Sequence, residues 1–396
     1  MVPHLSDTLV KKILPDKGLD GGNLALYVHW PFCVSKCPYC DFNSHVRDGV
    51  DHDAWRAALL ADLAHEAALL PHHRLTSIFF GGGTPSLMEP ATVAALIAAA
   101  RAHWPASDDL EITIEANPNS VEAARFADLA AAGVNRLSLG LQSFDDQSLA
   151  FLGRAHSARE GEAALAIAQK HFDRVSFDLI YALPGDDEAR WSAALDHALA
   201  KGTEHLSLYE LTIEPGTRFA TMVDKKIFTP LDDERAAALF ELTADRTAAA
   251  GLPAYEISNH ARPGAESRHN LTYWRYGDYA GVGPGAHGRR GCLRTVRHKK
   301  PENFLAGMAR NGHGLVEEEP LTATEAAHEA LVMGLRLAEG IDPAALARRL
   351  GLDRLVDDAA VDRLAHHGLL ERRGPILATT PAGRLLLDSI LAEIAA

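Results

Sequence analysis

Short runs of apolar and β-branched residues alternate with longer Ala- and Leu-rich stretches through the first half of the chain. The runs predict strands, and the stretches between them have the apolar spacing of helices. The predicted strands are Leu24–Trp30, Ser77–Phe80, Leu110–Glu115, Arg136–Leu141, Val175–Tyr181 and His205–Leu211. The predicted helices lie near 53–70, 90–103, 121–132, 145–150, 158–171 and 187–201. This alternation indicates an α/β fold with a parallel sheet, as a partial (βα) barrel or a doubly wound sheet.

The second half of the chain has a different pattern. A helix over 232–250 is followed by a segment, 251–300, that is rich in Gly, Pro, Arg and His and is expected to form loops and short strands. Helices near 322–338, 343–350 and 358–368, a hairpin over 369–378 and a last helix over 381–395 predict a mostly helical, winged-helix-like C-terminal domain. We divide the chain into a lead-in (1–22), a barrel (23–255), a connecting segment (256–310) and a C-terminal domain (311–396).

Composition and charge limit the function classes. Hydrophobic residues make up 47% of the 396 residues and charged residues 23%, as in soluble globular proteins. The formal net charge of -14 argues against a general nucleic-acid coat, so no nucleic-acid partner is expected. The sequence has no apolar run of the roughly 18 residues that a membrane span needs, and its start lacks the apolar stretch of a signal peptide. We therefore expect a cytoplasmic protein, whose thiols stay reduced.

Three of the four cysteines lie within eight residues, Cys33, Cys37 and Cys40, with the spacing C-x3-C-x2-C. A disulfide would leave one thiol over, and structural zinc sites use four ligands. Pro38 disfavours helical geometry at Cys37, so the segment is expected to be a loop after the first strand. Thiolates are the usual ligands of iron–sulfur clusters. The spacing therefore predicts a [4Fe–4S] cluster in which three irons bind cysteine and the fourth is open.

This motif, with Tyr39 before its last cysteine, resembles that of the radical S-adenosylmethionine (SAM) superfamily. The resemblance implies a partial (βα)6 TIM-like barrel, SAM bound at the open iron, and reductive cleavage of SAM to a 5′-deoxyadenosyl radical. The protein would orient the cofactor and exclude water, while the cofactor performs the chemistry. Whether this chain cleaves SAM is left open by its sequence.

Other segments extend the resemblance. Gly81-Gly82-Gly83-Thr84-Pro85 follows the second predicted strand, and polar residues stand at later strand ends, where ligands bind in (βα) barrels. From Leu24 to Gly288 the chain resembles the oxygen-independent coproporphyrinogen oxidase branch of the superfamily. The resemblance implies that SAM contacts Tyr27, Gly82, Gly83, Thr84, Glu115, Gln142, Arg154 and Asp178, with weaker local matches at Thr212 and His287.

Two features separate the members of this branch. The oxidases resemble C-x3-C-x2-C-x-C, whereas Phe42 stands at the position of the further cysteine here. His269-Asn270-Leu271-Thr272-Tyr273-Trp274 is similar to the H-N-x-x-Y-W stretch of the HemW-type haem chaperones. Neutral imidazole is a common axial haem ligand, so His269 becomes the candidate ligand, with aromatic surface for the porphyrin beside it.

The basic run Arg289, Arg290, Arg294, Arg297, Lys299 and Lys300 is predicted to be a solvated hairpin, with pairing to haem propionates as the alternative. The leading hypothesis is a haem chaperone that delivers haem to apo-haemoproteins such as respiratory cytochromes, carrying a [4Fe–4S] cluster and SAM. The resemblance also implies a homodimer, and contact with a membrane surface stays open. The alternatives are a coproporphyrinogen III oxidase and a winged-helix nucleic-acid binder that uses the cluster as a sensor.

Overall fold

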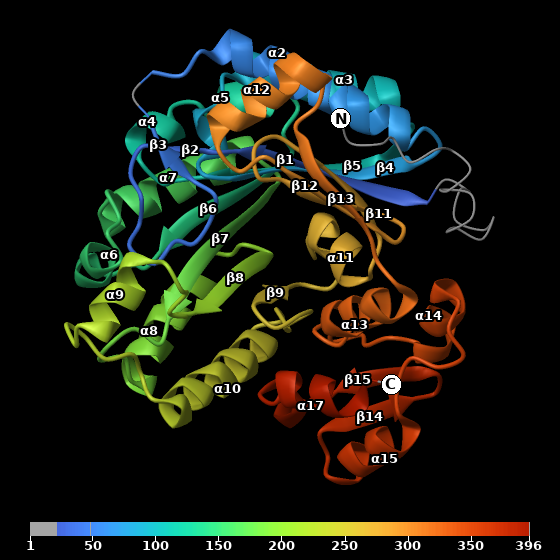
Figure 1. Ribbon diagram of the computed structural model, residues 1–396. Helices are drawn as coiled ribbons and strands as arrows, with labels where there is room; N and C mark the ends of the chain where they lie inside the picture. Colours follow the sequence, from blue (N-terminus) through green and yellow to red (C-terminus); the bar gives the residue numbers. More distant parts are fainter. Residues whose placement is uncertain (1–21, 48, 396) are drawn as a thin grey trace.

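A computed structural model describes residues 22–47 and 49–395, so the predicted lead-in lies almost wholly outside the described residues. Six parallel strands form the first part of the main sheet, in the order β1-β4-β5-β6-β7-β8 (Figure 1). Their bounds are β1 Asn23–Trp30, β4 Arg74–Gly82, β5 Ala106–Ala116, β6 Arg136–Gln142, β7 Arg174–Tyr181 and β8 His205–Glu210. The six predicted strands and the α/β fold class are confirmed.

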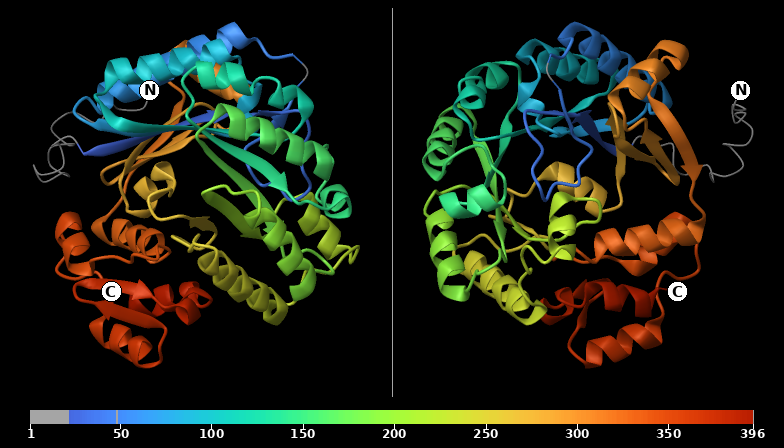
Figure 2. Two further views of the ribbon diagram at one scale, coloured as in Figure 1. Left: turned by 180° about the vertical axis from the view of Figure 1, so that it is seen from behind. Right: turned by 60° about the vertical axis from the view of Figure 1, so that its left-hand side comes forward.

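The sheet is curved, and helices cover its convex face (Figures 1 and 2). These helices are α2 His52–Leu69, α3 Pro90–His103, α4 Ser120–Ala123, α5 Phe126–Ala131, α6 Asp146–Phe151, α7 Ala158–His171 and α8 Glu188–Leu199. Two more, α9 Arg218–Asp224 and α10 Asp233–Ala249, follow β8. Together with the sheet they form an incomplete (βα) barrel.

Alternation along each strand gives the sheet two different faces. In β6, Leu137, Leu139 and Leu141 are fully buried in the main hydrophobic core, while Arg136 and Ser138 line a cavity on the concave side. The same holds in β7, where Phe177 is in the core and Asp178 faces the cavity. The interior of this barrel is therefore polar, which suits a binding site better than a packed core.

The sheet continues beyond the six strands on both sides. β10 (Asp278–Val282) pairs parallel to β1, and β11 (His287–Arg290), β12 (Leu293–Arg297) and β13 (Leu315–Pro320) follow as antiparallel strands. At the other edge, β9 (Asn259–Ala261) pairs antiparallel to β8.

Two helices were not expected in this region. α11 (Arg268–Trp274), on the concave side of the sheet, contains the H-N-x-x-Y-W stretch, and α12 (Pro301–Asn311) packs on α2 (Figure 1).

The C-terminal part has its own small core, which includes Leu331, Val361, Leu377 and Ile394. Its elements are α13 Ala323–Gly334, α14 Pro343–Leu350, α15 Asp358–His366, β14 Leu370–Arg373, β15 Ile376–Thr379, α16 Pro381–Arg384 and α17 Leu387–Ile394. The predicted hairpin is present, but the predicted last helix is two helices separated near Leu386. None of the described helices is both long and apolar enough to cross a membrane.

Candidate functional site

The three cysteines lie in the segment that follows β1, at the carboxyl end of the parallel strands. Cys33 ends the short strand β2 (Phe32–Cys33), which pairs with β3 (His45–Val46). Cys37 and Cys40 are joined by a turn in which the Cys40 N–H donates to the Cys37 carbonyl at 3.2 Å. All three are free thiols and only partly exposed. The predicted loop is thus present, with its thiols held between strand and turn.

Two side chains, one just after β4 and one in the loop after α6, donate hydrogen bonds to two of the sulfurs. The Thr84 hydroxyl donates to Cys33 Sγ at 3.5 Å, and Arg154 donates from Nη1 to Cys37 Sγ at 3.4 Å. Asn117 connects these two donors, since its Nδ2 donates to Thr84 Oγ1 at 3.0 Å and its Oδ1 accepts from Arg154 Nη2 at 2.6 Å. Thr84 and Arg154, both predicted as site residues, therefore meet at the cysteine segment.

The electrostatics of this segment fit an iron–sulfur cluster. Burial raises the pKa values of the Cys33 and Cys40 thiols, and the neighbouring thiols raise them further, so the free thiols are held protonated. A bound cation removes that penalty, because it deprotonates a coordinating thiol outright. Among the described residues, no three His, Cys, Asp or Glu side chains converge as ligands of one metal ion. Three free thiols in one short segment are a donor set that iron–sulfur clusters use, because cluster irons take thiolate ligands.

The glycine segment after β4 packs directly against the start of the cysteine segment. Gly82 has a φ of +113°, and a Cβ there would stand 2.6 Å from His29 Cε1. A Cβ on Gly83 would stand 2.7 Å from the Phe32 carbonyl oxygen. Both positions therefore need glycine, which explains the Gly-rich sequence between β4 and Thr84.

Two partly buried carboxyl groups face the cavity beside this segment. Glu115, at the end of β5, accepts a hydrogen bond from the Gly82 N–H at 3.2 Å. Burial and the charge of Asp178 raise the pKa of Glu115 to about 8. Burial likewise raises the pKa of Asp178 to about 6, and Ser207 and Arg136 oppose that shift. At neutral pH the Glu115 carboxyl is therefore mostly protonated and the Asp178 carboxyl mostly ionised.

Of the other predicted site residues, some line the main cavity and some do not. Tyr27 and His287 line the main cavity, and the Tyr27 hydroxyl is 3.0 Å from His29 Nδ1. Tyr39 packs against Phe219 instead, with its ring 6.2 Å from that of Phe219. Gln142, with a φ of +68°, and the exposed Thr212 do not line the main cavity.

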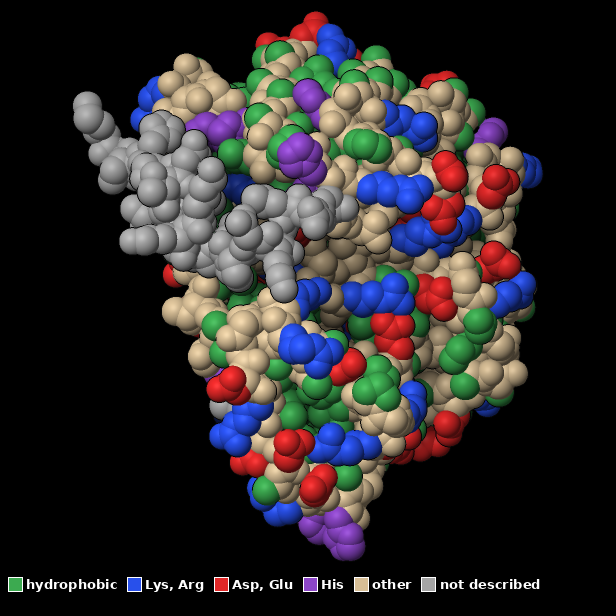
Figure 3. All heavy atoms as spheres, turned by 90° about the vertical axis from the view of Figure 1, so that its right-hand side faces the viewer, with side chains coloured by type: hydrophobic (Ala, Val, Ile, Leu, Met, Phe, Trp, Pro, Cys, Tyr) green, Lys and Arg blue, Asp and Glu red, His purple; other side chains and the backbone are tan. Residues whose placement is uncertain are grey.

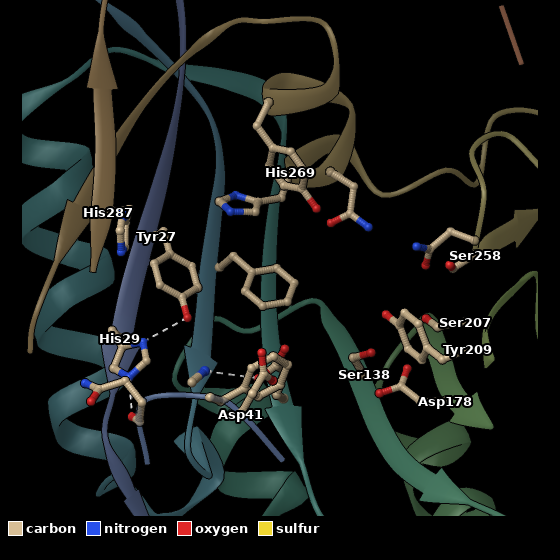
Figure 4. Close-up of a pocket in the computed structure, with 18 of the residues that line it drawn as sticks. Tyr27, His29, Asp41, Ser138, Asp178, Ser207, Tyr209, Ser258, His269 and His287 are labelled. Atoms are coloured by element: carbon tan, nitrogen blue, oxygen red, sulfur yellow. Dashed lines mark hydrogen bonds between the residues drawn. The ribbon is translucent and has the colours of Figure 1, made fainter. Parts of the chain in front are cut away.

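The main cavity has a volume of about 870 Å³ and occupies the concave side of the sheet (Figure 4). Its lining includes Lys36, Asp41 and Phe42 from the cysteine segment, and His269, Tyr273 and Trp274 from α11. One cavity thus joins the cysteine segment to the H-N-x-x-Y-W helix, and its size is at the upper end of the range for small-molecule sites.

His269 lies deep in this cavity, and its ring reaches from α11 toward Tyr27 (Figure 4). The side chain is buried, with its ring stacked on Phe79 at 4.9 Å and Nδ1 3.0 Å from Ser77 Oγ. Its backbone N–H donates to Glu111 at 3.1 Å. Burial lowers the pKa of His269 to about 4, so the imidazole is neutral at physiological pH. A neutral ring with one nitrogen fixed by a hydrogen bond is typical of a metal-binding histidine. The same contacts also fit a histidine that is simply packed into the wall of the cavity.

The prediction that the basic run is solvated is correct for Arg294, Lys299 and Lys300, which are exposed, and wrong for Arg289 and Arg297, which are buried. Arg297 is fully buried and donates to Asp62 Oδ2 at 2.6 Å and to Glu66 Oε1 at 2.8 Å. Arg289 is also buried, with its guanidinium 3.6 Å from the centre of the Tyr276 ring. The cause is strand alternation in β11 and β12, which turns these side chains inward onto acidic residues of α2 and aromatic residues of the adjoining elements.

Several cavity residues were missed by sequence reasoning. They are His29, Arg136, Ser138, His205, Ser207 and Tyr209. Asn117, which lies beside the thiols and not at the cavity, was missed as well. Most stand at alternate positions of the predicted strands, so a search for polar residues along the inner face, rather than only at the strand ends, would have found them.

The fold and the cysteine segment define the class of this protein: residues 27–198 match the radical SAM superfamily and residues 321–386 match the HemN C-terminal domain. A relative named "Heme chaperone HemW" from Escherichia coli is 38% identical over 375 residues, which cover 93% of this chain and 97% of that protein. The chain therefore belongs to the HemW family. It is also 45% identical over 328 residues to the mitochondrial "Radical S-adenosyl methionine domain-containing protein 1" of Bos taurus, covering 80% of this chain and 74% of that one.

Among solved structures, the coproporphyrinogen III oxidase HemN of Escherichia coli matches with a TM-score of 0.78. The match covers 94% of this chain and 90% of that one at 23% sequence identity, so it supports the fold alone.

Proposed function

We propose that this protein is a haem chaperone, which binds haem in the main cavity and passes it to apo-haemoproteins such as respiratory cytochromes. The observation that carries the proposal is the single cavity lined by both the cysteine segment and the His269 helix. It agrees with the name of the bacterial relative that matches over nearly its whole length. Phe42 stands at the position where the oxidases have a further cysteine. It lines this cavity and is 60% exposed.

In this proposal Cys33, Cys37 and Cys40 hold a [4Fe–4S] cluster, and SAM occupies the adjoining end of the cavity. When bound, the cluster supplies one-electron reduction of SAM. The chain's own groups position these ligands: Arg154 and Thr84 donate to the sulfurs, and the glycine backbone of Gly82 and Gly83 lies against the cysteine segment. We expect the protein to act in the cytoplasm.

Haem would enter as cargo, with the neutral His269 imidazole as a ligand and Tyr273 and Trp274 as flat neighbours. Tyr273 and Trp274 stack edge to face with ring centres 4.7 Å apart, which fixes both planes at the wall of the cavity. A nucleic-acid role has less support, because arginines of the β14 wing pair with acids, Arg372 with Asp358 and Arg373 with Glu371. On the face drawn in Figure 3, basic and acidic side chains are interspersed.

The test is haem binding by anaerobically reconstituted protein. We expect saturable binding with a visible spectrum that changes in His269→Ala. His260→Ala is the matched control, since His260 is also buried, with Nδ1 2.8 Å from Thr247 Oγ1, but lies outside the cavity. Absence of haem binding, or a spectrum that no cavity histidine affects, would reject the proposal. Decarboxylation of coproporphyrinogen III with SAM and a reductant would establish an oxidase instead.

A further inference from the structure

The C-terminal part of the chain contributes one wall of the main cavity. Met333 near the end of α13 and Arg336, two residues beyond that helix, line the cavity there, and every other lining residue lies before residue 300. In Figure 1, α13 lies below α11, and the two helices are in contact. The function proposed above uses His269, Tyr273 and Trp274 of α11 but neither of these two residues.

The backbone around Arg336 is held on both sides. Leu335 is buried in the small C-terminal core, and its carbonyl oxygen accepts a hydrogen bond from Thr379 Oγ1 at 3.3 Å. Two residues after Arg336, the Ala338 N–H donates to the Tyr255 carbonyl at 2.9 Å. The first bond ties the segment to the C-terminal core, and the second ties it to the loop before β9. Arg336 therefore projects from a fixed backbone where these two parts of the chain meet.

Two groups hold the Arg336 guanidinium. Its Nη2 donates to Glu256 Oε2 at 3.3 Å, and its Cζ lies over the Trp274 ring, 4.5 Å from the ring centre. Glu256 is itself fixed, because its Oε1 accepts from the Ser258 N–H at 2.9 Å and from Asn259 Nδ2 at 2.6 Å. A guanidinium is attracted to the face of an aromatic ring, so an arginine anchored to a fixed carboxylate restricts the ring beside it.

Glu256 balances the charge of Arg336, so this contact requires no further anion. A second Arg–Glu pair joins the same parts of the chain. Arg275, directly after α11, donates from Nε and Nη2 to the two carboxylate oxygens of Glu339 at 2.6 Å and 2.8 Å. That pair is exposed, and neither of its residues lines the cavity. Both arginines thus connect α11 to the C-terminal part, but of the two only Arg336 lies over a cavity side chain.

We propose that Arg336 is a positioning residue of the haem site and acts through Trp274. It holds the indole ring in one plane at the cavity wall, where the ring would lie against the porphyrin. The inference rests on the proposed function, because haem is the ligand concerned. A side chain that is ordered before binding loses less conformational entropy when its ligand arrives, so the fixed ring favours haem binding. The C-terminal part thereby takes part in haem binding through a residue outside the H-N-x-x-Y-W stretch.

The experiment is a haem titration, followed by visible absorbance, of four full-length, cluster-loaded proteins: the wild type, Arg336→Lys, Trp274→Leu and the double variant. Lysine keeps a positive charge beside Glu256 but lacks the planar group that lies over the ring. We expect Arg336→Lys to weaken haem binding about two- to fivefold. In the Trp274→Leu background the same substitution should have no further effect, because Arg336 then has no ring to hold.

Arg275→Lys is the matched control, since it breaks the two-bonded contact with Glu339 beside the same ring without altering the cavity lining. It should leave haem affinity unchanged. An equal loss of affinity in Arg275→Lys, or the same loss from Arg336→Lys with and without Trp274, would overturn the proposal. Wild-type haem binding with an unaffected Arg336→Lys would reject this inference alone, whereas a wild type that binds no haem would reject the proposed function and this inference with it.

Discussion

Arg154 connects the cysteine segment to the barrel, because the guanidinium that donates to Cys37 Sγ at 3.4 Å also donates to the Gly140 carbonyl at 2.8 Å. The same nitrogen, Nη2, donates to Asn117 Oδ1. One planar side chain thus fixes the positions of a cysteine and two strand ends, β5 and β6, relative to one another.

Arg154→Lys should weaken cluster retention. Lysine has a single nitrogen and lacks the planar fork that serves three acceptors, so at least one bond is lost. Bonds to charged groups contribute about 1.5–3 kcal/mol, which corresponds to at least a tenfold faster loss of iron to a chelator. The exposed Arg159→Lys is the control. Equal rates of iron loss in both variants would contradict the role given to Arg154.

Cys40→Ser should abolish the cluster, whereas Cys292→Ser should retain it. Cys40 is one of the three grouped thiols, and Cys292 lies just before β12, packed beside the small core around Tyr276. The measurement is iron and acid-labile sulfide per chain after anaerobic reconstitution. Loss of iron in Cys292→Ser as well would mean that the fourth cysteine is a ligand.

The parallel strands could be predicted because each is a short apolar run ended by a polar residue. Strand β10 could not, since Asp278–Val282 is short and interrupted by Gly281, and it forms only by pairing with β1. Helix α11 was hidden by its mixed polar and aromatic sequence, and tertiary contacts stabilise it. Its first turn is capped by the Ser267 side chain, and the His269 N–H donates to Glu111, a residue 158 positions away.

In the candidate site, too, residues in local motifs could be predicted and residues placed by distant contacts could not. The cysteines, Thr84 and Arg154 could be predicted from local motifs, and the structure brings them together. Asn117 was missed because a single Asn before Pro118 has no distinctive pattern, and its function depends on two residues far away in sequence. The burial of the Arg297 side chain could not be predicted from the sequence either, because its partners lie more than 200 residues earlier, in α2.

Glu115→Gln should make stability less dependent on pH. The carboxyl titrates near 4.5 when unfolded and near 8 in the native state. Between these values the native state keeps a proton that the unfolded state has lost, so the free energy of unfolding falls as pH rises. The whole shift corresponds to on the order of 3–5 kcal/mol. Urea unfolding at pH 6 and pH 8 should show a smaller difference in the variant, while the exposed Glu89→Gln should match the wild type.

Buried histidines should produce the opposite trend below pH 6.5. Burial lowers the pKa values of His29, His156, His260 and His269 to about 4. From pH 6.5 down to 4 the unfolded chain binds protons that these rings do not, so stability is lost as pH falls. His260→Gln, outside the cavity, should reduce the slope of unfolding free energy against pH in this window. An unchanged slope would show that His260 titrates normally.

Arg297 and Arg294, three residues apart in β12, offer a comparison of a buried and an exposed ion pair. Arg297 has no exposed surface and bridges Asp62 and Glu66, whereas the side chain of Arg294 is 46% exposed and pairs with Glu319 on β13. Arg297→Met leaves Asp62 buried without its cation, while Glu66 keeps its contact with Arg290 at 2.9 Å, and should cost about 3–5 kcal/mol of unfolding free energy.

Arg294→Met should cost at most about 1 kcal/mol, since exposed pairs are screened by water and salt. Urea unfolding of both variants in the same buffer measures the difference. Haem affinity should be unchanged in Arg294→Met, because its guanidinium is paired on the outer strands and does not line the cavity. A large loss of haem affinity in this variant would restore the alternative in which the basic run binds the propionates.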